Sequence, residues 1–368
     1  MAPTSYIVVA RTVEVIPLQP VAPYARDDLT VNLVFRVTLS FFANLVCVVP
    51  LKYLAHHGEF AAAVFVCTVI VLNALTIVNS LIWRDNNVEN WWKGHVWCDV
   101  HPYIYQTAST IFLTSAIAIM QNLAQQVKLL RVGPVSITEK HRKMWLQFSI
   151  IFPLPIIQMG WLYPLSTQRY IIGPLKGCLW SATPSWPFTV FFLLPSPPLA
   201  LLAASYSILA WKNYLEIEPI TRSAIASDTS AAGRLNRTRC RLLFMITYVI
   251  LPALVPICVY NVHEIISYYS WQQFNFRKVH YENNPWPWDS VILYTSDQMP
   301  FVELNFDYLY SATGVMVFVF FGFTSDTKDY YRRCKRAMRL DGLFNSLRDN
   351  SSPNERPDHL GPLRPRLS

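Results

Sequence analysis

The chain has 368 residues, of which 52% are hydrophobic and only 15% are charged. Because a soluble domain usually carries about a quarter charged residues, this composition argues against a soluble globular protein and favours a membrane protein. The formal net charge of +8 would suit a nucleic-acid-binding protein. The basic residues lie mainly in the loops between apolar segments, however, as in a membrane protein.

The first 29 residues precede the apolar segments and contain no secretory signal. The early apolar run from Tyr6 to Ala10 is shorter than the roughly 7 to 15 residues that a signal core needs, and Arg11 ends it. We therefore expect residues 1–29 to form an unprocessed extracellular segment ahead of the first span.

Seven apolar blocks follow, and each approaches the length of about 20 residues that a spanning helix needs. Prolines in the fourth and fifth blocks, such as Pro153 and Pro195, predict interruptions, because each proline removes a helical hydrogen bond. The sequence thus predicts an all-α membrane protein with a seven-transmembrane helix bundle. Its spans cover about residues 30–52, 60–82, 103–127, 144–165, 187–211, 242–267 and 303–324.

The distribution of basic residues predicts the orientation of this bundle. Lys and Arg gather in the loops of one side and after the last span, and such loops stay in the cytoplasm. Tryptophan has the opposite bias, since only Trp145 and Trp211 fall on the basic side. We therefore expect the N-terminus outside and the C-terminus in the cytoplasm. Residues 325–344 then form an amphipathic segment on the inner leaflet, and residues 345–368 form a disordered tail.

Some polar residues and prolines inside the spans are candidates for function. His263 and Glu264, near the outer end of the sixth span, form an ionisable pair that is costly in a membrane, although an interfacial cap explains them equally well. Pro252 and Pro256 lie one turn apart and predict a bend, which serves either structure alone or an activation hinge. Arg36, near the outer end of the first span, either snorkels to the headgroups or contacts a ligand or an outer carboxylate.

The cysteines suggest one covalent link. Only Cys98 and Cys178 fall in outer segments, where disulfides persist. We expect a bridge that ties the second outer loop to the third span, and two unpaired thiols are the alternative. The other cysteines lie in spans or on the inner side, at Cys47, Cys67, Cys240, Cys258 and Cys334.

Signatures of enzymes are absent from the sequence. The chain has no HExxH, GxSxG, CxxC, GxGxxG or GxxxxGK[ST] motif, so we predict neither an enzyme nor a bound metal or cofactor. A polytopic transporter or channel remains the alternative function. Such a protein needs a polar path with paired charges across the midplane, and the spans offer amides but few charges.

Five stretches carry a resemblance to a known family. They are IVNSLIW (77–83), VWCDV (96–100), GC (177–178), LPALVP (251–256) and FFGFTSDTKDYYR (320–332). In these stretches the chain resembles the fungal mating-pheromone receptors of the a-factor type, over about residues 30 to 340. One departure is the inner end of the third span, MQNLAQQVKLLR, which lacks the paired arginines of many members.

The resemblance implies a class D G-protein-coupled receptor in the plasma membrane of a fungal cell. Its partners would be a farnesylated, carboxyl-methylated peptide pheromone, a heterotrimeric G protein and the lipid bilayer, without nucleic acid, while the oligomeric state, a homodimer included, stays open. The ligand-binding candidates are Trp91, Trp92, Trp97, Asp99, Trp180, His263, Glu264, Trp286 and Trp288. The candidate contacts of the G protein are Lys140, Arg142, Lys143, Arg234, Arg237, Arg239 and Arg241.

Overall fold

The computed structural model describes residues 5–9, 12–17, 22, 24, 26–128, 137–227, 247, 251–266, 271–282 and 286–322. Within these residues, six helical stretches are long and apolar enough to cross a membrane: Asp27–His56, Phe60–Ile82, Trp97–Gln125, His141–Leu165, Trp186–Lys212 and Phe301–Phe321. The protein is thus mostly helical, as predicted. The expected span at 242–267 lies only partly within the described residues, so it stays a prediction.

Four helices pack around one buried core. They are α1 (Asp27–His56), α2 (Phe60–Ile82), α3 (Trp97–Lys128) and α12 (Tyr308–Phe321). Their buried core includes Phe65 stacked on Phe112, whose ring also meets Tyr310 edge-on. Gly314 of α12 lets two backbones approach, because a Cβ there would lie 2.9 Å from the Cβ of Ala43.

The remaining spans are interrupted, as their prolines predict. One span divides into α4 (Ile137–Ile151) and α5 (Pro153–Leu165), which meet at Phe152. The next begins with α6 (Trp186–Phe188), passes through a π-helical turn (Thr189–Leu193) and continues as α7 (Ser196–Ser227). The last apolar stretch also divides, into α11 (Phe301–Asn305) and α12, although no proline stands at that break and none predicted it. In the partly described sixth segment, α9 (Leu251–Ile266) packs against α7.

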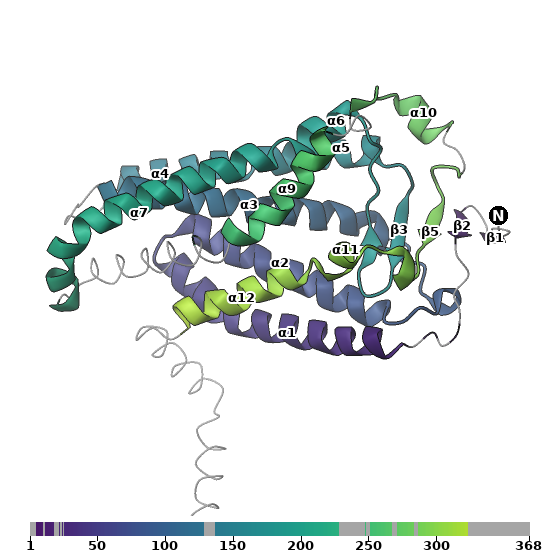
Figure 1. Ribbon diagram of the computed structural model, residues 1–368, viewed down its shortest axis with the longest axis horizontal. Helices are drawn as coiled ribbons and strands as arrows, with labels where there is room; N and C mark the ends of the chain where they lie inside the picture. The colour runs from purple at the N-terminus through teal and green to yellow at the C-terminus, as the bar shows by residue number, and fades with distance from the viewer. Residues whose placement is uncertain are drawn as a thin grey trace, which may run out of the picture. The chain divides into compact units, whose positions relative to one another are not determined.

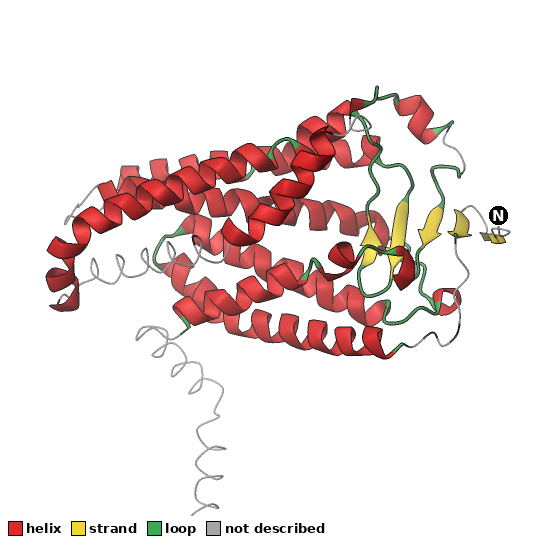
Figure 2. Ribbon diagram, viewed as in Figure 1, coloured by secondary structure: helices red, strands yellow, loops and turns green. Residues whose placement is uncertain are grey.

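A five-stranded sheet lies at one end of the helices, and the sequence analysis did not predict it (Figures 1 and 2). Its order is β1 (Ser5–Val9), β2 (Thr12–Ile16), β5 (Val291–Leu293), β3 (Tyr170–Gly173) and β4 (Gly177–Leu179). Pairing is antiparallel within β1–β2 and β3–β4 and parallel where β5 joins them. The expectation of an all-α protein is therefore incomplete. The strands are runs of three to five residues drawn from three distant segments, too short to separate from loops by pattern.

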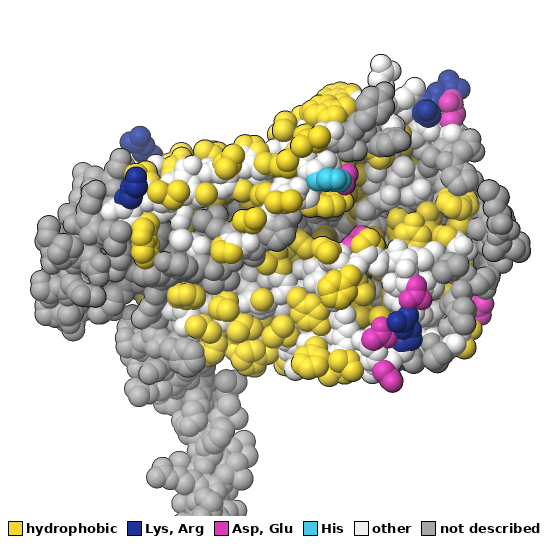
Figure 3. All heavy atoms as spheres, in the orientation of Figure 1, with side chains coloured by type: hydrophobic (Ala, Val, Ile, Leu, Met, Phe, Trp, Pro, Cys, Tyr) yellow, Lys and Arg dark blue, Asp and Glu magenta, His cyan; other side chains and the backbone are white. Residues whose placement is uncertain are grey.

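Two short helices complete this end, α10 (Phe276–His280) and the 3-10 turn Ser296–Gln298, and a further 3-10 turn covers Val88–Asn90. Figure 3 shows hydrophobic side chains spread along the flank of the helices, with the coloured charged side chains mostly toward the two ends. That distribution is the one a lipid bilayer requires of a spanning bundle.

Candidate functional site

The predicted disulfide is present and fixes the sheet to the helices. Cys98, in the first turn of α3, is bonded to Cys178 of β4, so the predicted bridge is confirmed. Gly94 precedes Cys98 with a φ of +73°, and a Cβ there would collide with the Cys98 sulfur. We call the five strands together with the loop from Trp83 to Cys98 the roof.

Tryptophans hold the loop part of the roof in shape. Trp83 is fully buried, stacks on Trp92 and donates a hydrogen bond of 2.9 Å to the Trp92 carbonyl. Trp91 is also buried, and its indole donates to the Asp85 carbonyl at 3.1 Å. Of the candidate ligand residues in this loop, Trp92 is the one that the surface displays most openly, with 46% of its area exposed.

Polar contacts close the rim of the roof. Lys93 forms an ion pair of 2.9 Å with Glu14 of β2. Asn86 donates to the Ser296 hydroxyl at 2.8 Å and accepts from the Ser296 amide at 3.0 Å. Tyr170 donates to the Lys93 carbonyl at 3.1 Å, and burial raises the pKa of Tyr170 to about 12. The loop from Trp83 to Cys98 is thus joined to β2, to β3 and to the 3-10 turn that follows β5.

Two candidate ligand residues at the start of α3 have partners of their own. Asp99 accepts two hydrogen bonds from Arg169, Nε to Oδ1 at 2.7 Å and Nη2 to Oδ2 at 2.6 Å. These bonds raise the pKa of the Arg169 guanidinium above its ordinary value. Trp97 donates to the Asn79 side chain at 3.1 Å, and Asn79 donates to the Lys176 carbonyl at 2.9 Å. Both residues therefore link the roof to the bundle.

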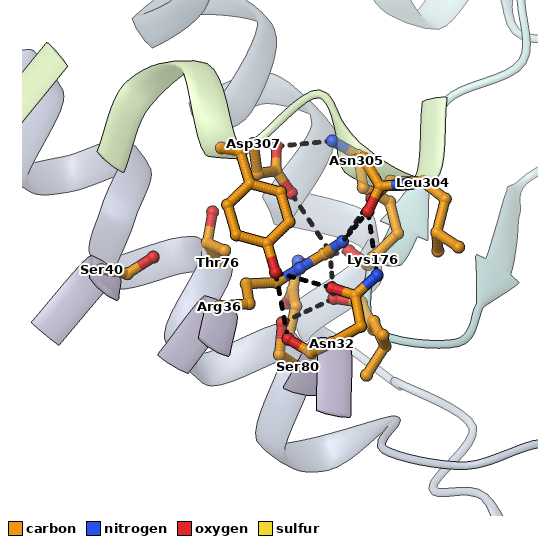
Figure 4. A network of polar contacts seen from close by, with 12 residues as sticks. Asn32, Arg36, Ser40, Thr76, Ser80, Lys176, Leu304, Asn305 and Asp307 are labelled. Atoms are coloured by element: carbon orange, nitrogen blue, oxygen red, sulfur yellow. Dashed lines mark hydrogen bonds and ion pairs between the residues drawn. The ribbon is translucent and has the colours of Figure 1, made fainter. Parts of the chain in front are cut away.

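Directly beneath the roof lies a buried group of charged and polar residues, which we call the Asp307 network (Figure 4). Lys176, in the turn between β3 and β4, donates to the Asp307 carboxylate at 2.6 Å and to the Tyr105 hydroxyl at 2.9 Å. Tyr105 in turn donates to Asp307 at 2.9 Å. Arg36 of α1 approaches the other Asp307 oxygen at 3.9 Å and donates to the Leu304 carbonyl at 2.5 Å. Four helical elements and the roof meet in this network.

Aromatic side chains line the flank beside the roof. Trp180 packs against Phe188 and Phe192, with ring centroids 6.0 and 4.9 Å away. Trp288 meets Tyr163 and His280 at 5.3 and 5.2 Å and donates to the Ser166 carbonyl at 3.0 Å. Such surfaces suit an apolar group that carries a few polar atoms.

The structure does not gather the sequence candidates into one cluster. Trp91, Trp92, Trp97 and Asp99 share the roof loop and the start of α3, whereas Trp180 packs on the π-helical turn and Trp288 on α5. Trp286 lies half-buried against the hydrophobic cluster of Val15, Ile171 and Ile292. His263 faces outward from α9 with 81% of its side chain exposed, and lies 3.7 Å from Glu264. His263 therefore lies at the surface of α9, whereas Glu264 is partly buried.

At the end of the bundle opposite the roof, Lys143 lies 3.4 Å from the carboxylate of Glu59, which also accepts from Asn122 at 3.0 Å. Arg142 is exposed on α4. Lys140 lies within α4, although its side chain is outside the described part of the chain. The other basic candidates, Arg234, Arg237, Arg239 and Arg241, are also outside the described residues. Pro252 and Pro256 both lie in the first half of α9.

Sequence reasoning missed the centre of the network. Lys176 lies between the fourth and fifth predicted spans and Asp307 lies within the seventh, and the sequence pattern predicted no role for either. Arg36 is 0% exposed, so the expectation that it snorkels to the headgroups is wrong and its alternative, contact with an outer carboxylate, holds. The available signal was that two opposite charges stand inside apolar blocks, where an unpaired charge is costly.

Comparisons with known proteins identify relatives. The family described as pheromone A receptor matches residues 35–339. The chain is 24% identical to the pheromone a factor receptor of Saccharomyces cerevisiae over 305 residues, which are 83% of this chain and 62% of that relative. It is also 24% identical to the pheromone M-factor receptor of Schizosaccharomyces pombe over 192 residues, which cover 50% of this chain and 51% of that relative.

A third relative is pheromone receptor 1 of Ustilago hordei, 24% identical over 248 residues, with 63% of this chain and 65% of the relative covered. The match therefore spans less than two thirds of the length of each of these relatives. All three carry the name of a receptor, not of an enzyme.

Proposed function

Since this chain belongs to the pheromone A receptor family, we propose that it is a seven-helix receptor for a farnesylated peptide mating pheromone. It would signal through a heterotrimeric G protein from the plasma membrane. The observation that carries the proposal is the family match, because it runs from within α1 past the end of α12. The named relatives are receptors of a factor, M-factor and a further pheromone.

The proposed topology places the roof outside the cell. Support comes from the bond between Cys98 and Cys178, since disulfides persist in oxidising compartments and the bond lies at the roof end. The basic residues of α4 lie toward the opposite end, as the positive-inside rule requires. Residues 1–29 would then be extracellular, residues 30–324 would form the bundle, and residues 325–368 would be cytoplasmic.

For the ligand, we propose that the aromatic flank takes the farnesyl group and that the rim of the roof takes the peptide. The exposed surfaces of Tyr163 and Trp186 support the first part, because burying apolar area is worth about 25 cal/mol per Å². The ion pair of Asp99 and Arg169 supports the second part, since it is only partly buried and within reach of a peptide. Trp91 and Trp97 would act by shaping the loop.

On the inner side, we propose that Lys140, Arg142, Lys143 and the arginines at 234, 237, 239 and 241 meet an acidic surface of the G protein. Pheromone would favour one arrangement of the proline-containing helices, with α9 bending near Pro252 and Pro256. Only a difference in pheromone affinity between the two arrangements can shift their populations.

The test is expression of the chain in a responsive yeast that lacks its own receptor. Farnesylated peptides should activate a pheromone-response reporter, and matched peptides without the farnesyl group should need far higher concentrations, because a prenyl chain contributes about 0.8 kcal/mol per buried CH₂. An empty vector supplies the baseline. Equal potency of the two peptide forms would remove the lipid part of the proposal, and no response to any farnesylated pheromone would remove the receptor function.

A further inference from the structure

We propose that the contact between Lys176 and Asp307 is a lock that holds the roof closed on the bundle, and that Asp307 is left with Arg36 when the roof opens. The lock would control access of the ligand to the outer end of the bundle. As a statement about pheromone access, it rests on the proposed function. As a statement about the roof, it can be tested without any ligand.

The turn that carries Lys176 is inserted among the helices. Its Leu175 amide donates to the Trp83 carbonyl at 2.6 Å, and its Leu175 carbonyl accepts from Ser80 at 2.7 Å. Leu175 has a φ of +61°, a left-handed conformation that is costly for a branched side chain and persists only where surrounding contacts impose it. Gly177 follows with a φ of +73°, and a Cβ there would press on Asn79 and Trp83. The turn is therefore held against the bundle in a strained form, and the lock is one of the contacts that hold it.

The charges of the network favour exchange of partners. Arg36, Lys176 and Asp307 have side chains that are 0%, 6% and 3% exposed, so two buried cations share one carboxylate. Lys176 is the near partner at 2.6 Å and Arg36 the far one at 3.9 Å. Withdrawal of Lys176 to the surface would leave a neutral pair of Arg36 and Asp307. Loss of Asp307 would instead leave two cations buried without a counter-charge, which is strongly destabilising.

The position of Asp307 connects the roof with the helices. Asp307 stands at the break between α11 and α12, and it also accepts from Tyr105 of α3. Lys176 approaches the rings of Tyr105 and Phe306, at 4.8 and 5.9 Å. Movement of the roof would thus remove the positive charge of Lys176 from Asp307, the residue that precedes α12. A lock of this kind connects opening of the roof with a helix that continues to the inner side.

The test measures how readily reagent passes beneath the closed roof. Ser80 is fully buried under the turn, so a Ser80→Cys variant places a thiol there, and a membrane-impermeant methanethiosulfonate reports its exposure. Labelling is measured on the full chain in membranes, and the labelling of the chain that lacks Ser80→Cys is subtracted as background. In this background, Lys176→Met should raise the labelling rate at least about tenfold, because the buried ion pair is lost.

The matched control is Lys93→Met in the same background. Lys93 is also a roof lysine in a close ion pair, but its partner, Glu14, belongs to the roof itself. This change strands Glu14, whose side chain is 8% exposed, within the roof, but it leaves the contact between Lys176 and Asp307 in place, so the rate should stay within about twofold. A rate that Lys176→Met does not change, or that both variants raise equally, would overturn the lock.

A second variant covers the case of a folding defect. Asp307→Asn keeps the shape of the side chain but strands two cations, so it should lower the amount of receptor at the surface while Lys176→Met retains it. Equal surface amounts of the two variants would contradict the shared-carboxylate explanation. Because labelling needs neither pheromone nor G protein, fast labelling of Lys176→Met in a chain that answers no pheromone would keep the lock and reject the proposed function.

Discussion

The half of the bundle built from α1, α2, α3 and α12 differs from the half built from α4, α5, α7 and α9 in how its helices are held. The share of buried residues in the apolar stretch of each span is 67% for α3, 56% for α2 and 39% for both α1 and α12, but 28% for the span from His141 to Leu165 and 22% for that from Trp186 to Lys212. The first half also contains the Asp307 network and a buried chain in which Ser311 donates to Asn73 and shares a hydrogen bond with the Ser40 hydroxyl. The second contains the proline interruptions and the π-helical turn.

This difference suggests a division of labour between a framework half, α1–α2–α3–α12, and a mobile half, α4–α5–α7–α9. Buried polar contacts with several partners fix one arrangement, because each lost partner leaves an unsatisfied group in a dry interior. Helices that face lipid over most of their surface lose much less when they pivot. Pheromone-driven movement is therefore expected in the mobile half, and the Asp307 network would attach the roof to the framework.

Substitutions at two glycines should show the largest difference between the two halves. In the framework half, a leucine at Gly314 would press on Ala43 and Cys47, so Gly314→Leu should cost about 1–3 kcal/mol or prevent folding. In the mobile half, a Cβ at Gly160 meets nothing within 4 Å, so Gly160→Leu should have little effect. The effects of both substitutions are measured by thermal melting of the purified receptors and by the amount of receptor at the cell surface. Equal losses in the two variants would show that the halves are not held differently.

The link from the framework to the roof is expected to matter next. Asp99→Ala removes both hydrogen bonds to Arg169, and Trp97→Ala removes the bond to Asn79. Each should shift the pheromone dose–response curve by about tenfold, which corresponds to about 1.4 kcal/mol, while surface expression stays intact. The control is Arg84→Ala, because its contact with Asp85 is long and solvent-exposed. Curves that coincide with the wild type would remove these residues from ligand recognition.

Much of the framework could be read from the sequence, because its spans are long apolar runs and a pair of outer cysteines predicts its own bond. The Asp307 network could not be read in the same way. Its central contact joins residues 131 positions apart, and nothing local distinguishes Lys176 from the other lysines of an outer loop. The sheet of the roof could not be predicted for a related reason. The short segment β5 becomes a strand by pairing with β2 and β3, which come from distant parts of the sequence. Sequence pattern predicts which residues avoid water, whereas the partners of buried charges depend on the assembled fold.

Proline substitutions in the mobile half test whether the bend of α9 takes part in activation. Pro256→Ala restores a backbone donor inside α9 and should straighten it, so the maximal response should fall by about half while pheromone binding persists. The control is Pro198→Ala, because Pro198 lies in the first turn of α7, where a proline removes no helical bond. Reporter output and binding of a fluorescent pheromone measure the two effects. A full response from Pro256→Ala would show that the bend is structural only.

The smallest effect is expected where the two halves meet on the inner side. Lys143 of α4 contacts Glu59 at the start of α2, but Glu59 keeps its bond from Asn122 when the lysine is removed. Lys143→Ala should therefore lower stability by less than about 1 kcal/mol. Arg142, exposed on the same helix, offers the comparison, since Arg142→Ala should leave melting unchanged and reduce only nucleotide exchange by the reconstituted G protein. If both variants reduce exchange without a change in melting, this basic surface acts by contact with the G protein. If neither reduces it, the charges of α4 serve topology alone, and the contact must lie on other inner segments.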